Sequence, residues 1–224
     1  MSEPVLVLGD DPLARALRAA SPRTMSPLTL VTDPSRLPEA LAGGSRQVAL
    51  TAWSEGGYRA SRKLGLPAAV ATFGSLLPLE GEGPTDISLP AGLSGAARER
   101  MRASLTEALG EVVEVAEGPG LVRGRILACL VNEAAHLLGE GQAQANDIDR
   151  AMVLGMNQPR GPLAWADLIG LDVVERLLLA LAREYGAEMY RPAPALSRRV
   201  MAGHTGQRAG AGFFQYGADG GSAP

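Results

Sequence analysis

The sequence is poor in the residues from which metal and disulfide sites are made. Its 224 residues include one cysteine and two histidines. A single cysteine excludes an intrachain disulfide and any zinc site that needs several thiolates. Cys129 falls inside an apolar stretch that predicts a helix, so we interpret it as a small core residue. We therefore expect no metal site in this chain.

Positive charge and long apolar runs are also scarce. The formal net charge is −3, and this leaves no basic footprint of the kind that binds nucleic acid. No apolar run is long enough to span a membrane. The first residues also lack the basic segment with which a signal peptide begins. We expect a cytoplasmic protein with neither a nucleic-acid nor a membrane partner.

Short apolar runs alternate with helical patterns in the first half of the chain. Helices are expected after Asp11, around Leu37 and over Tyr58–Leu64. Strands joined by short helices predict a parallel sheet with crossovers, so we expect an abbreviated Rossmann-like, doubly wound domain over residues 1–117. The expected parallel strands are Val5–Leu8, Leu28–Val31, Val48–Trp53 and Ala68–Phe73.

The rest of this domain is less regular. Leu76–Pro90 is rich in proline, glycine and acid, which predicts a loop with a possible strand at Asp86–Leu89. Ser94 is a suitable N-cap for a helix that ends before Gly110. Val112–Val115 is expected to be the last strand of the domain.

The second half reads as helical, and a Gly-Pro-Gly turn at 118–120 marks the boundary. We expect a helical domain over 118–217 and a disordered tail over 218–224. In its centre, Asn146 is predicted to cap a helix that stops at Gly155, and Pro162 to open the next one. Asp172 and Glu175 have the spacing of a capping box for a third helix.

Apolar residues at helical spacing fill this half. One predicted helical stripe contains Ile126, Leu130, Ala134 and Leu137, and His136 falls off it, so a solvated histidine is expected. His204 lies in a glycine-containing loop and is expected to be solvated too. The apolar content exceeds what about 100 residues bury alone, which predicts a homodimer through this domain. The residues behind that expectation are Leu163, Trp165, Leu168, Ile169 and the Val173–Leu181 face.

Five motifs in this half occur in a fixed order. Together they resemble the C-terminal helical domain of the 3-hydroxyacyl-CoA dehydrogenase family, which includes 3-hydroxybutyryl-CoA dehydrogenases. The resemblance implies that this domain dimerises and lines a cleft for acyl-CoA, and that the cofactor is NAD. The motifs are NEAAHLLGEG (132–141), DIDRAM (147–152), PRGPLAWADLIGLD (159–172), RPAPAL (191–196) and GQRAGAGFFQY (206–216).

The turn after the first strand departs from a dinucleotide-binding pattern. That pattern, G-x-G-x-x-G, lets a pyrophosphate approach the backbone at a helix N-terminus. Here Gly9 is present, Asp11 stands at the second glycine and Ala14 at the third. Asp11 would repel a phosphate, or is simply an N-cap before Pro12. Asp33 follows the second strand as a ribose-binding acid would, or is a turn residue before proline.

The catalytic positions implied by the resemblance also depart from it. The family pattern has a histidine base oriented by a glutamate, but the stretch 71–76 contains no histidine. Thr72, Ser75 and Asp86 are the candidates for substitutes. An asparagine that contacts the substrate in the family is Gly124 here. Arg125 is retained, either for the substrate cleft or as an ordinary solvated residue at a helix start.

Two functions follow from the resemblance and its departures. In the first, the chain is a divergent member of the family in acyl-CoA metabolism, with little or no hydride transfer, acting as a dimeric acyl-CoA-binding or scaffold protein. In the second, it is an active NAD-dependent 3-hydroxyacyl-CoA dehydrogenase that uses substitute catalytic residues.

Overall fold

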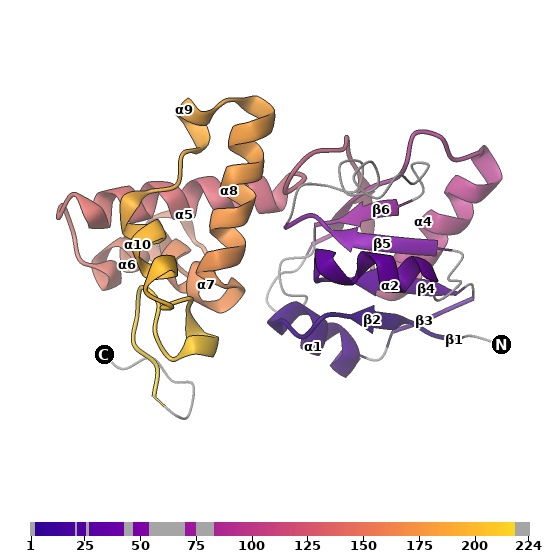
Figure 1. Ribbon diagram of the computed structural model, residues 1–224, viewed down its shortest axis with the longest axis horizontal. Helices are drawn as coiled ribbons and strands as arrows, with labels where there is room; N and C mark the ends of the chain where they lie inside the picture. The colour runs from indigo at the N-terminus through magenta and orange to yellow at the C-terminus, as the bar shows by residue number, and fades with distance from the viewer. Residues whose placement is uncertain are drawn as a thin grey trace. The chain divides into compact units, whose positions relative to one another are not determined.

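The chain divides into two compact units, Met1–Gly124 and Arg125–Pro224. A computed structural model describes residues 3–20, 22–25, 27–42, 47–53, 70–74 and 83–217. The first unit contains the sheet and the second is helical (Figure 1). The helix expected at Tyr58–Leu64, Ser75 and the tail after residue 217 lie outside the described residues.

The first unit is built on a six-stranded sheet in which the expected parallel strands are found. In order across the sheet these are β2 (Leu6–Leu8), β4 (Leu28–Val31), β5 (Gln47–Thr51), β6 (Val70–Phe73), β7 (Thr85–Ser88) and β8 (Val112–Glu114). The first four are mutually parallel, β7 is antiparallel to β6, and β8 is parallel to β7. A separate two-stranded ladder pairs β1 (Glu3–Pro4) with β3 (Arg23–Thr24), and no sequence pattern indicated it.

Helices cover both faces of this sheet, as a Rossmann-like fold requires. Helix α1 (Pro12–Ala20) and helix α4 (Gly95–Leu109) pack on one face, and helix α2 (Leu37–Ala42) packs on the other. In β2, β4, β5 and β6, neighbouring residues divide between one core on each face of the sheet, because successive side chains point to opposite faces. Ser94 caps α4 as expected, accepting a hydrogen bond from the Ala97 N–H at 3.4 Å.

The order of the strands differs from that of a dinucleotide-binding sheet. The six described strands lie side by side in the same order in which they occur in the sequence. In the dinucleotide-binding order the chain reverses direction across the sheet, and the ligand lies in the crevice at that reversal. Among the described strands there is no such reversal, and therefore no topological switch point of the kind on which that crevice depends.

The second unit packs its helices around a leucine-rich core. Its elements are α5 (Arg123–Gly139), α6 (Ala145–Met156), α7 (Pro162–Ile169), α8 (Leu171–Tyr185), α9 (Ala187–Tyr190), α10 (Pro194–Met201) and the 3-10 turn η2 (Gln207–Ala209). No helix in the described part of the chain is long and apolar enough to cross a membrane. The largest fully buried side chains of this unit are Leu163, Leu171, Leu177, Leu178, Leu181 and Leu196.

Several predicted helix ends are wrong by a residue or two, although the helices themselves are present. Helix α6 begins at Ala145, so Asn146 is inside it and is not the cap. The same helix runs past Gly155 to Met156 and ends on Asn157 in the left-handed conformation. Pro162 does open α7, as predicted.

The predicted capping box and apolar stripe are also corrected. The N-cap of α8 is Gly170, and Asp172 pairs with Arg176 at 3.3 Å instead of capping the helix. Glu175 instead accepts a hydrogen bond from the Ser197 hydroxyl at 2.5 Å. Ile126, placed on the buried stripe of α5, is 57% exposed. His136 is half-buried, and His204 is exposed as expected.

Candidate functional site

The turn between β2 and α1 is the place where a dinucleotide would meet the first unit. Here the Asp11 carboxylate accepts a hydrogen bond from the Ala14 N–H at 2.8 Å. Pro12, the first residue of α1, has no N–H to offer. The carboxylate therefore caps the helix and places a negative charge at the N-terminus, where the helix dipole favours an anion.

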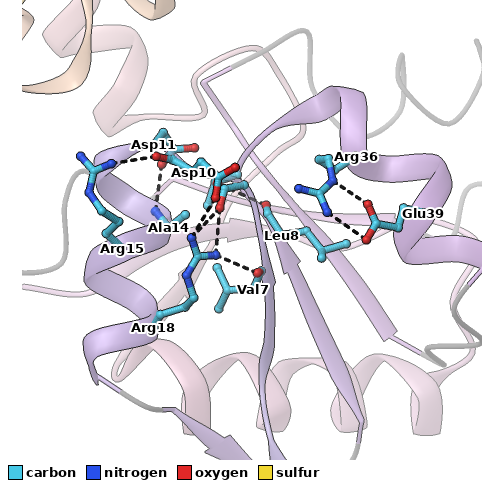
Figure 2. A network of polar contacts seen from close by, with 11 residues as sticks. Val7, Leu8, Asp10, Asp11, Ala14, Arg15, Arg18, Arg36 and Glu39 are labelled. Carbon is cyan, nitrogen blue, oxygen red and sulfur yellow. Dashed lines mark hydrogen bonds and ion pairs between the residues drawn. The ribbon is translucent and has the colours of Figure 1, made fainter. Parts of the chain in front are cut away.

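An arginine from α1 folds back over the same turn (Figure 2). The Arg18 guanidinium donates to the Gly9 carbonyl at 2.7 and 2.8 Å and to the Val7 carbonyl at 3.1 Å. It also lies 3.4 Å from the Asp10 carboxylate. Arg15 donates to the Asp10 carbonyl at 2.9 Å. These contacts fix the turn from within the chain itself.

Glycine is required at position 9 of this turn, both by its backbone conformation and by a close neighbour. Its φ is +137°, and a Cβ there would lie 2.0 Å from the Thr32 hydroxyl oxygen. Thr32 follows β4, and its N–H donates to the Leu8 carbonyl at 2.9 Å. The first glycine of the pattern therefore serves the packing of β2 against β4.

Asp33 lies on the neighbouring turn and is used locally. Its carboxylate accepts the Ser35 N–H at 2.9 Å, which is an Asx turn at the start of the 3-10 turn η1 (Pro34–Arg36). Arg36 pairs with Glu39 at 2.5 Å, and that hydrogen bond lowers the pKa of Glu39. The charged groups of these two turns are three arginines and four acids, Arg15, Arg18, Arg36, Asp10, Asp11, Asp33 and Glu39.

The candidate catalytic substitutes Thr72 and Asp86 are both buried and both have structural partners. The Thr72 hydroxyl donates to the Glu117 carboxylate at 3.2 Å. Asp86 Oδ2 accepts from the Val122 N–H at 2.8 Å and from the Arg123 N–H at 3.1 Å. Asp86 is therefore the acid that caps the first turn of α5. Ser75 falls outside the described residues.

Arg125, the substrate-cleft candidate, contacts aromatic residues of the helical unit. Its guanidinium donates to the Tyr190 hydroxyl, and its central carbon lies 4.3 Å from the centre of the Tyr185 ring. The two rings are themselves 6.1 Å apart. Such cation–π and hydrogen-bond contacts hold α5 to α8 and α9. Arg125 therefore already has packing partners in the structure.

Three buried polar side chains tie the helical unit together, and the first is Asn132 of α5. Its amide nitrogen donates to the Arg191 carbonyl at 3.0 Å, and its amide oxygen accepts the Ala193 N–H at 2.8 Å. A single side chain thus pairs a donor and an acceptor of the segment that precedes α10. This contact joins the first motif to the fourth.

Asp149 of α6 is the second of these side chains. Its two carboxylate oxygens accept the N–H groups of Leu163 and Ala164, both at 2.8 Å. Asp149 therefore caps α7 from another helix. Gly161 leaves room for it, because a Cβ at that position would lie 2.2 Å from the carboxylate carbon.

Asp167 of α7 is the third, and it holds the C-terminal segment. Its oxygens accept the Phe213 N–H at 2.8 Å, the Phe214 N–H at 2.9 Å and the Tyr216 hydroxyl at 2.9 Å. Gly212 lies against it, since a Cβ there would be 2.0 Å from Asp167 Oδ1. The side chain is 1% exposed.

Burial shifts the ionisation of this group of residues. Removal from water raises the pKa of Asp149 and of Asp167, while their backbone hydrogen bonds act in the opposite direction. Burial and the nearby Asp167 charge raise the pKa of Tyr216 as well. Tyr216 therefore stays protonated at neutral pH and donates to the carboxylate. Among the residues that the structure describes, no three His, Cys, Asp or Glu side chains are grouped to hold a metal.

The helical unit matches a known family model. Residues 120–216 match the 3-hydroxyacyl-CoA dehydrogenase C-terminal domain. The chain therefore contains a domain that is similar to the C-terminal domain of the 3-hydroxyacyl-CoA dehydrogenase family. The five motifs lie within the matched range, and Asn132, Asp149 and Asp167 are the residues that join them. Sequence reasoning missed these three roles, although each residue stands inside one of the motifs.

The curated relatives of this chain match it over about half of its length. A probable 3-hydroxybutyryl-CoA dehydrogenase of Bacillus subtilis is 44% identical over 114 residues, which is 50% of this chain and 40% of the relative. A 3-hydroxybutyryl-CoA dehydrogenase of Clostridioides difficile is 42% identical over 113 residues, again 40% of the relative. The match thus spans well under half the length of these curated relatives.

One solved structure extends the likeness beyond the helical domain. The crystal structure of (S)-3-hydroxybutyryl-CoA dehydrogenase from Ralstonia eutropha superposes with a TM-score of 0.70 at 26% identity. It covers 85% of this chain and 70% of that chain. Because the family model matches residues 120–216, this coverage extends the likeness of fold into the sheet unit.

Proposed function

We propose that this chain is a divergent member of the 3-hydroxyacyl-CoA dehydrogenase family that performs little or no NAD-dependent hydride transfer. It acts instead as a dimeric acyl-CoA-binding or scaffold protein. The observation that carries the proposal is the capped mouth of α1. Asp11 takes the N–H of Ala14 that a pyrophosphate would need, and it brings its own negative charge.

Three further features support the loss of the cofactor. The described strands lack the reversal of order that forms a dinucleotide crevice. The charged groups around the two turns amount to three positive and four negative charges, which disfavours a pyrophosphate. The arginine nearest the turn, Arg18, already binds two backbone carbonyls. The residues present at this edge do not fit NAD.

The catalytic groups support the loss of the reaction. Reduction of a ketone by hydride needs a proton donor within hydrogen-bond reach of the carbonyl oxygen. Both histidines lie in the second half of the sequence, and Asp86 is committed to the N–H groups of Val122 and Arg123. Gly124 has no side chain to contact a substrate. General acid–base catalysis contributes roughly 10²–10⁴-fold, so its loss alone reduces a typical turnover of ~10 s⁻¹ to well below one per second.

Two measurements test this proposal. Titration calorimetry with NADH is expected to show weak or no binding, and a dissociation constant in the low micromolar range would contradict it. Loss of NADH absorbance with saturating acetoacetyl-CoA is expected to stay below roughly 1 s⁻¹. A faster turnover would establish the alternative of an active NAD-dependent dehydrogenase. That alternative is favoured by the fold likeness to the Ralstonia enzyme, and Thr72, Ser75 and Asp86 would then be the first residues to change.

The proposed dimer rests on a different surface from the one expected from sequence. Leu163, Trp165 and Ile169 are buried within the chain's own helical unit and offer no interface. The helical unit nevertheless exposes other large apolar side chains, and such a surface is typical of an interface. Light scattering is expected to give twice the chain mass of 23.2 kDa, and a monomer would refute the dimer. The exposed residues are Ile126, Leu154, Met156, Leu179, Tyr185, Met189 and Met201.

A further inference from the structure

The segment that leads into α5 holds a leucine in an unfavourable backbone conformation. Leu121 has a φ of +46°, in the left-handed region that residues with a Cβ rarely adopt. Asn157 is the other non-glycine residue with positive φ in the described chain, and asparagine tolerates this region better. Leu121 is only 6% exposed. Strain of this kind persists where surrounding contacts over-determine the backbone.

Contacts from the sheet provide that over-determination. The Gly120 N–H donates to the Ala52 carbonyl at 2.8 Å, just beyond β5. Asp86 then holds the N–H groups of Val122 and Arg123 through one oxygen. The Arg123 guanidinium donates to the Pro84 carbonyl at 3.2 Å. These contacts come from two places, the end of β5 and β7 with the residue before it, and together they fix residues 120–123.

The same contacts carry a cost at Asp86. Its second oxygen, Oδ1, is buried and has no hydrogen-bond partner among the described residues. It lies against Gly74, where a Cβ would be 2.2 Å away. A buried carboxylate oxygen without a donor is costly, and hydration would relieve it. Release of the segment therefore relieves both the Leu121 backbone and the Asp86 carboxylate, and it loses the hydrogen bonds of Oδ2.

We propose that residues 118–123 and Asp86 form a latch that opens locally while the sheet stays folded. In the closed state Asp86 fixes the first turn of α5. In the open state the segment that joins the two units becomes free chain, and Leu121 leaves the left-handed conformation. The closed state has the hydrogen bonds to Asp86 Oδ2, whereas the open state relieves the Leu121 backbone and hydrates Asp86 Oδ1. Because these gains offset part of the loss, the free energy of opening is below that of global unfolding.

Asp149 is a comparable helix cap that has neither a strained backbone beside it nor an unpartnered carboxylate oxygen. It also accepts two backbone N–H groups, from Leu163 and Ala164. Each of its oxygens has a donor, and the capped residues lie in regular helix. The exchange of the Leu163 and Ala164 amides is therefore the internal reference for the latch.

Hydrogen exchange of the wild-type chain tests the latch directly. The Val122 and Arg123 amides are expected to exchange at least ~10-fold faster than the Leu163 and Ala164 amides. Their exchange should also be insensitive to low urea, because local opening exposes little surface. If Val122 and Arg123 exchange at the rate of the β5 amides and with the same urea dependence, they open only by global unfolding and the proposal fails.

Matched variants assign the latch to Asp86. In Asp86→Asn the exchange of Val122 and Arg123 is expected to rise by a further ~10-fold or more, because charge-assisted hydrogen bonds are lost. Asp149→Asn should leave these two amides unchanged. Limited trypsin digestion gives a second readout, with cleavage after Arg123 faster in Asp86→Asn than in Asp149→Asn. Equal effects of the two variants on the latch amides and on cleavage would overturn the assignment.

Discussion

In both units aspartate side chains accept backbone N–H groups, but the sequence separation between the partners differs. In the helical unit, Asp149 and Asp167 accept backbone N–H groups from segments far away in the sequence. In the sheet unit, Asp11 and Asp33 accept backbone N–H groups from residues two or three positions away. The first pair joins distant segments of the helical unit, and the second pair caps two turns at the edge of the sheet where we propose that NAD is no longer bound.

This difference lies in how much of the chain each interaction constrains. A long-range clasp constrains both of its ends, because the glycines that face Asp149 and Asp167 admit no side chain. A local cap constrains only the residues of its own turn. A substitution in the helical unit therefore affects two distant segments, whereas a substitution at Asp11 or Asp33 affects a single turn.

Removal of the Asp167 clasp gives the largest expected effect. Asp167→Ala leaves the N–H groups of Phe213 and Phe214 and the Tyr216 hydroxyl without their acceptor, in a buried site. We expect a loss of roughly 3–5 kcal/mol in the free energy of unfolding. Urea denaturation measures it, and Asp172→Ala is the control because that exposed acid should contribute less than about 1 kcal/mol. Equal effects of the two variants would refute the clasp.

Loss of the Asn132 clasp is expected to be the next largest. Asn132→Ala leaves the Ala193 N–H and the Arg191 carbonyl unpaired, which we expect to cost about 2–3 kcal/mol. Glu133→Ala changes the exposed neighbour on the same helix and should have little effect on the urea midpoint. A stability loss as large in Glu133→Ala would show that α5 is merely sensitive to substitution.

The local cap in the sheet unit should contribute less. Asp11→Ala is expected to cost about 1 kcal/mol, whereas Asp11→Gly should cost only a few tenths, as N-cap substitutions do. Asp11→Gly therefore also serves as a folded variant for NADH titration. Improved binding would identify the charge as the main obstacle. Unchanged weak binding would place the obstacle in the order of the strands. Asp10→Ala, whose side chain is 92% exposed, is the control.

The smallest expected effect is a pH dependence that belongs to the helical unit. Burial raises the pKa of Asp149 above its ordinary value of 3.8 in the folded state. The folded chain therefore binds this proton more tightly, and this contribution to stability falls as the pH rises from 3.8 through the folded-state pKa. Urea unfolding across this range should show the slope in the wild type but less of it in Asp149→Asn. If the free energy of unfolding fell more steeply with pH in the variant than in the wild type, the expected sign of the Asp149 contribution would be wrong.

The sequence predicted the elements better than their ends. Strand and helix positions follow from apolar spacing, which is set by burial in the folded chain. The ends depend on partners that spacing does not show. Asn146 was predicted as a cap from its own side chain, but α6 begins one residue earlier. Glu175 was predicted to cap α8 and instead accepts from Ser197 of α10.

The candidate site was predictable in its local part only. The interpretations of Asp11 as an N-cap and Asp33 as a turn residue concern neighbours in the sequence, and the structure confirms both. The contact between Asp86 and the start of α5 joins residues 36 positions apart. No period or motif in a single sequence indicates such a contact. Leu163, Trp165 and Ile169, which were expected at a dimer interface, are instead buried within the helical unit, because their burial depends on how the helices pack.

The sequential order of the strands has a consequence for how the sheet unit forms. Among the described strands, each one from β4 to β8 pairs with the sheet strand that precedes it in the sequence, so these pairings can form in the order of synthesis. In a sheet whose order reverses, an early strand remains open on one side until a much later one arrives. Pairing between near neighbours in sequence lowers contact order, which speeds folding. We expect the sheet unit to assemble strand by strand during synthesis, before the helical unit has left the ribosome.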